Sequence, residues 1–374
     1  MPPHNMMNDT SHNNEFTDAL SVLNANGWAE AAPLFLSLWA RAPINMRYGL
    51  MAGVALLKTG RVDDGVAQLS YLSEQNPIIR IAQYGGDEIP LPLKTASRDA
   101  DDAIRNAFTR VQENAIKSIG VTRAGRIATA LWPQTHSGPK QYPDNPMGPK
   151  PYVFYAPDLP PIPVFDNNDA PWTQALAAQT NTIRDEFLAL MEDSDSGAPY
   201  VPAQSQLGED WQKLRGQKTW NAVHLYKDGR AQSEAARCPK TLAVLSSVPT
   251  VMHNDGPMEV FFSVLAPDTT IPPHFGLANC RVTVHLPLLI PDNCAIRVAD
   301  ITHSWLKGEP FIFDDSFDHS AWNGSKTDQR VVLIFEAWRP DMTEGEIAAV
   351  EASYAARDML LKERSNRLRA LWPR

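Results

Sequence analysis

The histidines of this chain gather in one stretch. Five of the nine lie between residues 250 and 320, namely His253, His274, His285, His303 and His319. Neutral imidazole is a good ligand for iron, zinc and copper, and two histidines with a carboxylate mark many non-haem Fe(II) oxygenases. In sequence these oxygenases usually show His-x-Asp/Glu, then a distant histidine, and then an arginine a short way beyond it.

His274, His319 and Arg330 follow most of this pattern. His319 comes 45 residues after His274, and Arg330 follows eleven residues later. His274 is followed by Phe275 and Gly276, so the acidic residue is missing. A lone strand histidine is more often a structural hydrogen-bonding residue than a ligand. The residues alone therefore leave two interpretations of the segment FDDSFDHSAWNGSKTDQR at 313–330: a solvated turn, or half of a metal site.

The strand pattern indicates which polar side chains share a face. In CRVTVHLPLL three polar residues alternate with apolar ones: Arg281, Thr283 and His285. In RVVLIFEAW, Arg330 and Glu336 share one face of a nearly apolar strand, of the kind that is buried on both sides. A buried arginine needs an anionic partner, which is either a protein carboxylate or the carboxylate of a bound cosubstrate.

Short strand patterns, separated by Pro, Asp, Asn and Gly, begin at about residue 218 and predict a sandwich or jelly roll. Before them, residues 171–192 read as an amphipathic helix. Ten prolines between 133 and 163 predict an extended connector, because proline removes a donor and restricts its neighbour. A closing helix at about 343–370 is acidic at its start and basic at its end, as the helix dipole favours.

The N-terminal part shows a 34-residue period. Matching positions are Trp28 and Val62, Ala31 and Gly65, Phe35 and Leu69, Leu38 and Leu72, and Pro43 and Pro77. A small residue, a large apolar residue and a closing proline at this period resemble the tetratricopeptide repeat (TPR). Two repeats need a further packing partner, for which residues 98–118 are a candidate helix. An α-hairpin cap with no binding role fits the same pattern.

Composition indicates a soluble protein with an ordinary core. Of 374 residues, 43% are hydrophobic and 21% charged, and the formal net charge of -9 argues against nucleic acid as a partner. Three scattered cysteines form neither a disulfide framework nor a zinc signature. The polar N-terminus lacks the apolar stretch of a signal peptide, and no apolar run approaches the ~20 residues of a membrane helix. We therefore expect a cytoplasmic protein with no membrane insertion.

Several motifs in order resemble the aspartyl/asparaginyl β-hydroxylase family. They are PYVFYAPDLPPIPVFD, CPKTLAVL, FSVLAPDTTIPPHFGLANCRVTVHLPLLIP, FDDSFDHSAWN and RVVLIFEAWRPDMTEGE, and they cover about residues 150–345. The resemblance implies an α+β protein whose catalytic domain is a double-stranded β-helix (jelly roll, cupin-like), preceded here by the α-helical TPR-like region. It also implies Fe(II) and 2-oxoglutarate, with two histidines and no carboxylate as iron ligands.

Site roles follow from this resemblance residue by residue. His274 and His319 match the two iron ligands. Arg330 matches the arginine that pairs with the distal carboxylate of 2-oxoglutarate, and Ser263 a serine near that carboxylate. His285 matches a histidine near the metal-binding end of the cosubstrate.

One position departs from the family. Members often carry a second arginine two residues before His285, where this chain has Thr283, while Arg281 is retained as a cosubstrate-site residue. Asp314 and Asp315 admit two interpretations: Asp315 holds a metal-bound water or a histidine in place, or both aspartates cap backbone amides in a turn. A substrate channel is expected along four residues: Arg281, Trp305, Lys307 and Trp322.

The resemblance implies a dioxygenase that uses Fe(II), 2-oxoglutarate and O2 to hydroxylate an unactivated carbon, foremost the β-carbon of Asp or Asn in a peptide or protein. Alternatives are the same iron site acting on a small metabolite or lipid, halogenation in place of hydroxylation, and a non-catalytic TPR-type binding protein. A zinc hydrolase lacks the third protein ligand. The TPR-like region offers a surface for a protein partner. We expect these segments: a disordered tail 1–13, a helical region 14–120, a connector 121–165, the oxygenase domain 166–345 and a C-terminal helix 346–374.

Overall fold

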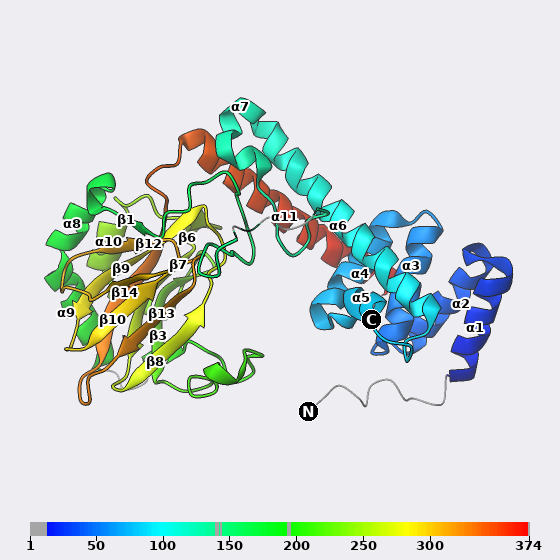
Figure 1. Ribbon diagram of the computed structural model, residues 1–374, viewed down its shortest axis with the longest axis horizontal. Helices are drawn as coiled ribbons and strands as arrows, with labels where there is room; N and C mark the ends of the chain where they lie inside the picture. The colour runs from blue at the N-terminus through cyan, green and yellow to red at the C-terminus, as the bar shows by residue number, and fades with distance from the viewer. Residues whose placement is uncertain (1–12, 139–141, 143, 193–195, 373–374) are drawn as a thin grey trace. The chain divides into compact units, whose positions relative to one another are not determined.

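The computed structural model describes residues 13–138, 142, 144–192 and 196–372, so all but the last residue of the expected tail 1–13 lies outside it. The chain forms two compact units (Figure 1). The helical unit comprises Met1–Val121, Thr135–Pro139 and Glu351–Arg374, and the sheet unit comprises Thr122–Gln134 and Lys140–Val350. Helices in one unit and an antiparallel sheet in the other make this an α+β protein, as predicted.

Two helix pairs open the helical unit. The helices are α1 (Asn13–Asn26), α2 (Trp28–Arg41), α3 (Met46–Lys58), α4 (Val62–Gln75), α5 (Ile78–Ile81) and α6 (Leu91–Ile119), followed by α7 (Val121–Ala124). The helices α2 and α4 begin 34 residues apart, at the positions where the sequence period starts. A Cβ added to Gly53 of α3 would lie 2.6 Å from the Leu69 side chain of α4, so a small residue is needed where the helices touch. This arrangement is consistent with the TPR-like pattern.

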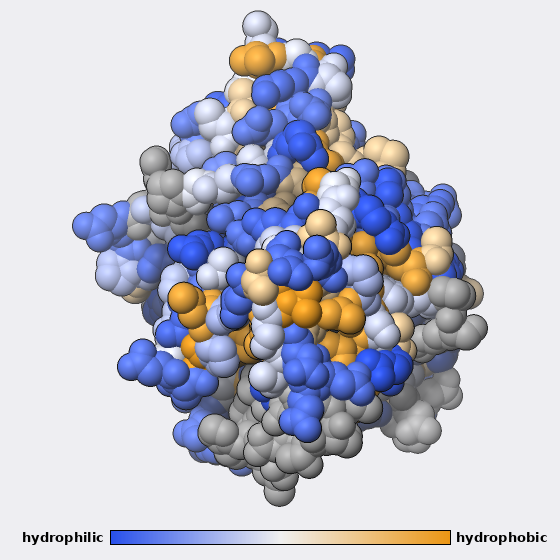
Figure 2. Space-filling model, turned by 90° about the vertical axis from the view of Figure 1, so that its right-hand side faces the viewer, coloured by the Kyte–Doolittle hydropathy of each residue, from blue (hydrophilic) through white to orange (hydrophobic). Residues whose placement is uncertain are grey.

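The face drawn in Figure 2 is mainly hydrophilic, with apolar side chains gathered in small groups. Over the described residues, the most exposed large apolar side chains include Ile44, Tyr84 and Leu91, at 79%, 79% and 73%. Single exposed apolar residues are ordinary on soluble domains. None of the helices in the described ranges is long and apolar enough to span a bilayer.

The sheet unit contains two antiparallel sheets and a small two-stranded ribbon. The larger sheet has the order β1-β12-β9-β14-β7-β3-β2, with β4 paired to β3, and the smaller sheet has the order β11-β10-β13-β8. The bounds of the larger sheet are β1 (Val164–Phe165), β2 (Ala198–Pro199), β3 (Trp220–Lys227), β4 (Arg230–Ala231), β7 (Glu259–Leu265), β9 (Arg281–Leu289), β12 (Phe311–Phe313) and β14 (Arg330–Trp338). Those of the smaller sheet are β8 (Thr269–His274), β10 (Cys294–Val298), β11 (Ile301–His303) and β13 (His319–Asn323), and the ribbon is β5 (Met252–His253) with β6 (Gly256–Pro257).

Helices cover one face of the larger sheet (Figure 1). They are α8 (Trp172–Ala178), α9 (Thr180–Met191) and α10 (Pro239–Leu245). Val331, Leu333 and Phe335 of β14 join the core beneath them. Since successive strand residues point to opposite faces, Arg330 and Glu336 point to the other side, toward the smaller sheet.

Some elements differ from the sequence expectation in their bounds. The helix expected at 171–192 is broken at Gln179, where α8 ends and α9 begins. The expected connector 121–165 opens with the short helix α7 and a 3-10 turn at Gly125–Thr129, and its described residues after that turn include several further turns and bends. The closing helix α11 spans Glu344–Leu371. The three cysteines are free and buried, in line with the absence of a disulfide framework.

Candidate active site

A cavity of about 370 Å³ lies between the facing sides of the two sheets, within the sheet unit. His274, His285, His319 and Arg330 all line it. These side chains come from four different strands, β8, β9, β13 and β14. The structure therefore brings residues that are up to 56 positions apart in the sequence into one concave site, which is the usual form of a ligand site.

The two histidines of the His-x-Gly pattern stand side by side. His274 and His319 are paired across β8 and β13, and their ring centroids are 4.0 Å apart. The Nδ1 atom of His274 lies 2.8 Å from the carbonyl oxygen of Pro272, and that of His319 lies 2.9 Å from that of Phe317. A carbonyl only accepts, so each Nδ1 carries the proton and donates it. Each Nε2 keeps its lone pair, which is the orientation that metal-binding histidines adopt.

Electrostatics also favours neutral imidazoles here. Burial, reinforced by the neighbouring His319, lowers the pKa of His274 to about 3, and burial lowers the pKa of His319 as well. Neutral imidazole is the metal-binding form. Over the described residues, no group of three or more His, Cys, Asp or Glu side chains is arranged to hold a metal ion. A metal here would have two protein ligands, as the family resemblance implies.

Arg330 lies at the start of β14 and is 1% exposed. Its Nη1 donates to Ser263 Oγ at 3.3 Å, and its guanidinium carbon lies 5.0 Å from the centre of the Trp305 ring. Among the described residues no Asp or Glu forms an ion pair with it, and burial lowers its pKa. A buried cation without a protein anion is unfavourable unless a ligand supplies the negative charge. The surroundings of Arg330 therefore suit an anionic ligand.

His285 extends the polar lining of the cavity. It is 6% exposed, and its Nδ1 has no hydrogen-bond partner in the described part of the structure. Burial and the nearby Arg330 and His319 hold its pKa well below the usual range, so the ring is neutral. Buried polar atoms are rarely left without partners, and an unpaired one in a cavity is typical of a site that binds a polar ligand.

The carboxylate of Asp315 occupies the space beside Gly276. A Cβ added to Gly276 would meet Asp315 Cγ at 2.2 Å. Thr283 Oγ1 donates to Asp315 Oδ2 at 3.2 Å, while Oδ1 has no partner in the described structure. Burial raises the pKa of Asp315. The carboxylate of Asp315, from another loop, therefore lies next to the position where the His-x-Asp/Glu pattern would have its acidic residue.

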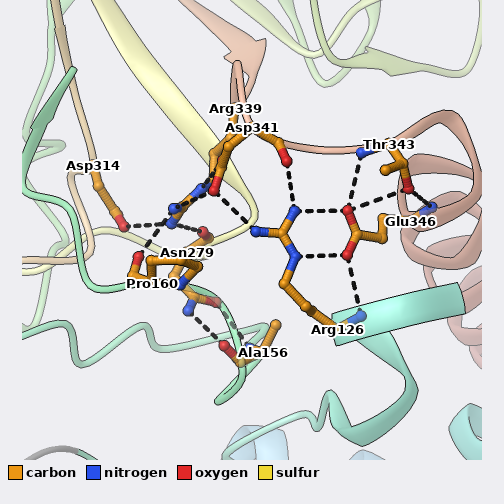
Figure 3. A network of polar contacts seen from close by, with 9 residues as sticks. All are labelled: Arg126, Ala156, Pro160, Asn279, Asp314, Arg339, Asp341, Thr343 and Glu346. Atoms are coloured by element: carbon orange, nitrogen blue, oxygen red, sulfur yellow. Dashed lines mark hydrogen bonds and ion pairs between the residues drawn. The ribbon is translucent and has the colours of Figure 1, made fainter. Parts of the chain in front are cut away.

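Asp314, in contrast, has a structural environment (Figure 3). Its Oδ1 accepts from the backbone N–H of Ser316 at 2.9 Å, which is the expected turn cap. Its Oδ2 lies 3.5 Å from Nη1 of Arg339, and that guanidinium also donates to the carbonyls of Asn279 and Pro160, at 3.1 and 3.0 Å. This network fixes the turn that carries Asp315 between β12 and β13.

The same network continues to the start of α11. Arg126 forms a bidentate pair with Glu346, with both nitrogen–oxygen distances at 2.7 Å, and Asp341 bridges Arg126 and Arg339 (Figure 3). The pKa of Glu346 is lowered to about 2, chiefly by its hydrogen bond from Arg126. The Glu346 side chain is 4% exposed and the Arg126 side chain 28%, so this ion pair, called the Arg126 clasp below, is partly buried in the sheet unit.

Two sequence expectations about the substrate side do not match the cavity. The four residues expected along a channel, Arg281, Trp305, Lys307 and Trp322, are not among its lining residues. Arg281 pairs instead with Glu336, at 3.1 Å from Nε to Oε1. The lining residues that sequence reasoning missed include Tyr200, Trp211, Glu259 and Glu336. Glu336 was available from the pattern, since it shares the strand face of Arg330.

Two further histidines of the sheet unit, His224 and His303, are not among the cavity's lining residues. His224 Nε2 is 3.2 Å from Glu259 Oε1, and the ring of His303 stacks on Phe311 with centroids 4.2 Å apart. They make hydrogen bonds and ring contacts, as expected for structural histidines.

The family match lies within the sheet unit. Residues 177–340 match the model of the aspartyl/asparaginyl beta-hydroxylase family, so the resemblance predicted from the sequence is confirmed for this segment. Among curated relatives, "Aspartate beta-hydroxylase domain-containing protein 2" of Xenopus tropicalis is 30% identical over 55% of this chain and 55% of its own length.

Two further relatives have more specific names. "Aspartyl/asparaginyl beta-hydroxylase" of Homo sapiens is 35% identical over 46% of this chain and 21% of its own length. "Ornithine lipid ester-linked acyl 2-hydroxylase" of Rhizobium tropici is 29% identical over 48% of this chain and 61% of its own length. The matched part thus spans between a fifth and three fifths of these relatives.

Proposed function

We propose that this protein is an Fe(II)- and 2-oxoglutarate-dependent dioxygenase that hydroxylates an unactivated carbon. One observation carries the proposal: a pair of neutral histidines with free Nε2 atoms shares a cavity with a buried arginine that lacks a protein anion in the described structure. Two imidazoles suit a redox-active metal, and an arginine fork suits a carboxylate. A hydrolase triad would need neither.

The donor set fits the two groups. His274 and His319 would hold the iron through Nε2, and Arg330 with Ser263 would hold the distal carboxylate of 2-oxoglutarate. When bound, iron and 2-oxoglutarate supply the oxidising chemistry, in which O2 is consumed and 2-oxoglutarate leaves as succinate and carbon dioxide. The protein orients these groups and keeps water out with its apolar lining.

His285 and Asp315 would take supporting roles. The unpaired Nδ1 of His285 offers a hydrogen bond to the cosubstrate. Asp315, fixed by Thr283, keeps one oxygen available to accept a hydrogen bond from a group bound beside the histidine pair. Halogenation is disfavoured, because the space beside Gly276 already contains this carboxylate and a chloride ion would be repelled.

The antiparallel sheets that face each other across the cavity support the finer assignment of a double-stranded β-helix, the jelly-roll or cupin-like fold. Substrates of two kinds are compatible with the relatives' names: an Asp or Asn residue in a peptide or protein, and a small molecule or lipid. A cytoplasmic location and a protein partner at the TPR-like helices belong to this proposal as well.

The test measures succinate by mass spectrometry after Fe(II), ascorbate and 2-oxoglutarate are added to the purified full-length protein. His319→Ala is expected to abolish its formation, whereas the matched control His303→Ala, outside the cavity, leaves it unchanged. If the wild type neither forms succinate nor binds 2-oxoglutarate, the proposal is wrong and a non-catalytic binding protein becomes the better hypothesis.

A further inference from the structure

We infer that the substrate carries a positively charged group, an ammonium or a guanidinium, which binds against three carboxylates at one end of the cavity. These residues, called the acidic wall below, are Glu259, Asp315 and Glu336. The inference rests on the proposed function, because it names the substrate class of the same site. It distinguishes this chain from an enzyme that recognises the free carboxylate of an aspartate.

Strand register gathers the acidic wall. Glu336 of β14 is paired with Thr283 of β9, and Thr283 in turn holds Asp315 through its hydroxyl. Glu259 opens β7, next to the pair formed by Val260 and Phe335, and so adjoins Glu336. Three strands and one turn therefore bring three carboxyl groups to the same side of the cavity.

The acidic wall is short of positive charge. Arg281 pairs with Glu336 and His224 contacts Glu259, but neither of these two side chains lines the cavity. Three carboxyl groups therefore face the cavity, with one arginine and one histidine behind them. Two carboxylate oxygens, Glu336 Oε2 and Asp315 Oδ1, are buried without a hydrogen-bond partner in the described structure. Unmet buried acceptors are unfavourable, and a ligand rich in N–H donors would satisfy both.

The pKa of Glu336 is set mainly by burial, which raises it to about 7. Arg281 opposes this rise, and the smaller effects of Asp315 and Glu259 add to it. Like charges raise each other's pKa when no cation intervenes. A second carboxylate brought by a substrate would increase this repulsion, whereas a cation would relieve it.

A ligand site is indicated independently of the acidic residues. Arg330 and His285 line the same cavity at 1% and 6% exposure, each with a nitrogen that has no hydrogen-bond partner among the described residues. Arg330 and Glu336 are six residues apart on one strand, about 20 Å at the usual rise, so the arginine does not neutralise the acidic wall. The cavity thus has an anion end and a separate cation end.

Aromatic side chains near the acidic wall suit a cation with an alkyl stem. Tyr200 stacks on Phe261 with ring centroids 5.4 Å apart, and both line the cavity with Trp211. Aromatic faces attract ammonium and guanidinium groups and also pack against methylene chains. Carboxylates with aromatic rings form the combination that recognises an alkyl cation.

The experiment compares matched probes on the full-length protein with Fe(II) and 2-oxoglutarate under nitrogen, so that binding is measured without turnover. Calorimetry measures the binding of the N-acetyl methylamides of lysine, norleucine and glutamate. A second pair of probes, n-butylamine and n-butanol, lacks a peptide backbone. Lysine is expected to bind at least about tenfold more tightly than norleucine, and glutamate most weakly. If n-butylamine also binds more tightly than n-butanol, the site recognises the cation without a peptide backbone.

Two variants locate the preference. Glu259→Gln and Glu336→Gln are expected to reduce the lysine-to-norleucine ratio at least about threefold each, while Asp292→Asn, exposed and outside the cavity, leaves it unchanged. Equal binding of lysine and norleucine, no measurable lysine binding, or an unchanged ratio in both variants overturns the inference.

Succinate formation by the same protein is measured separately. Cation preference without succinate would overturn the proposed function alone. Succinate without cation preference would overturn the inference about the substrate alone. Titration of the metal-free protein keeps the acidic wall testable when Fe(II) does not bind.

Discussion

Replacing Gly276 by alanine tests how the site accommodates the missing acid of the His-x-Asp/Glu pattern. The added Cβ would meet Asp315 Cγ and Oδ1 at 2.2 Å, whereas ordinary contacts begin at 3.4 Å. The carboxylate must therefore retreat by about 1.2 Å, the difference between these distances. Its hydrogen bond from Thr283, now 3.2 Å long, would break or bend.

We expect Gly276→Ala to destabilise the sheet unit by about 1–3 kcal/mol, the usual effect of overpacking with loss of a buried hydrogen bond. The backbone of Gly276 is not left-handed, so alanine adds no conformational strain. In an Asp315→Ala background the clashing atoms are absent, and the same change should be neutral or slightly stabilising. The coupling energy between the two sites is then about 1–3 kcal/mol.

Urea unfolding of the four proteins of this double-mutant cycle measures the coupling. The transition that Asp315→Ala shifts is assigned to the sheet unit, because the two units need not unfold together. Additive effects, with a coupling below about 0.5 kcal/mol, would refute the contact between Gly276 and the carboxylate.

Three further predictions concern charge and metal. Arg330→Met should stabilise the ligand-free protein by about 1 kcal/mol or more, since it removes a buried unpaired charge, yet abolish 2-oxoglutarate binding; calorimetry and urea unfolding measure both, and a destabilised variant contradicts the reasoning. The pKa of Glu346 is about 2 in the folded protein and 4.5 in its ordinary state. This difference adds up to about 3 kcal/mol to the free energy of unfolding above pH 4.5, and the contribution is lost as the pH falls toward 2. In the Glu346→Gln variant, the free energy of unfolding should therefore depend less on pH between 4.5 and 2, as measured by acid unfolding. The same pH dependence in variant and wild type would contradict the role given to the Arg126 clasp. The ring centres of Trp211 and His274 are 5.2 Å apart, so Co(II) bound at His274 should quench the tryptophan fluorescence of the wild-type protein. The Trp211→Phe variant should show less quenching, and equal quenching in both proteins would place the metal elsewhere.

The sequence identified several residues that the structure brings into one cavity, but not the residues that surround them. His274, His319 and Arg330 were recognisable because their spacing and residue types resemble a family pattern. The structure adds what spacing does not contain: the pairing of His274 with His319 across two strands, and the carbonyls that orient each ring. Strand pairing joins residues distant in the sequence, and a single sequence does not encode its register in a readable way.

Element bounds were predictable where local signals are strong. The start of α4 and the strand β14 followed from period and alternation. The break at Gln179 between α8 and α9 did not, because no proline or glycine marks it. The acidic wall was missed for a different reason: Glu259 lies in a strand whose partner was unknown, and only the order β9-β14-β7 places it beside Glu336.

A single strand determines the polarity of the cavity. Arg330 and Glu336 lie on the same face of β14, with the apolar residues Val332 and Ile334 between them. The first lacks a protein anion in the described structure, and the second has more acidic neighbours than basic ones. Two ligands of opposite charge would be held apart along that face, with the histidine pair of the smaller sheet facing it. Exchanging the two residues, with glutamate at 330 and arginine at 336, should therefore change which molecules bind while leaving the pairing of β14 unchanged.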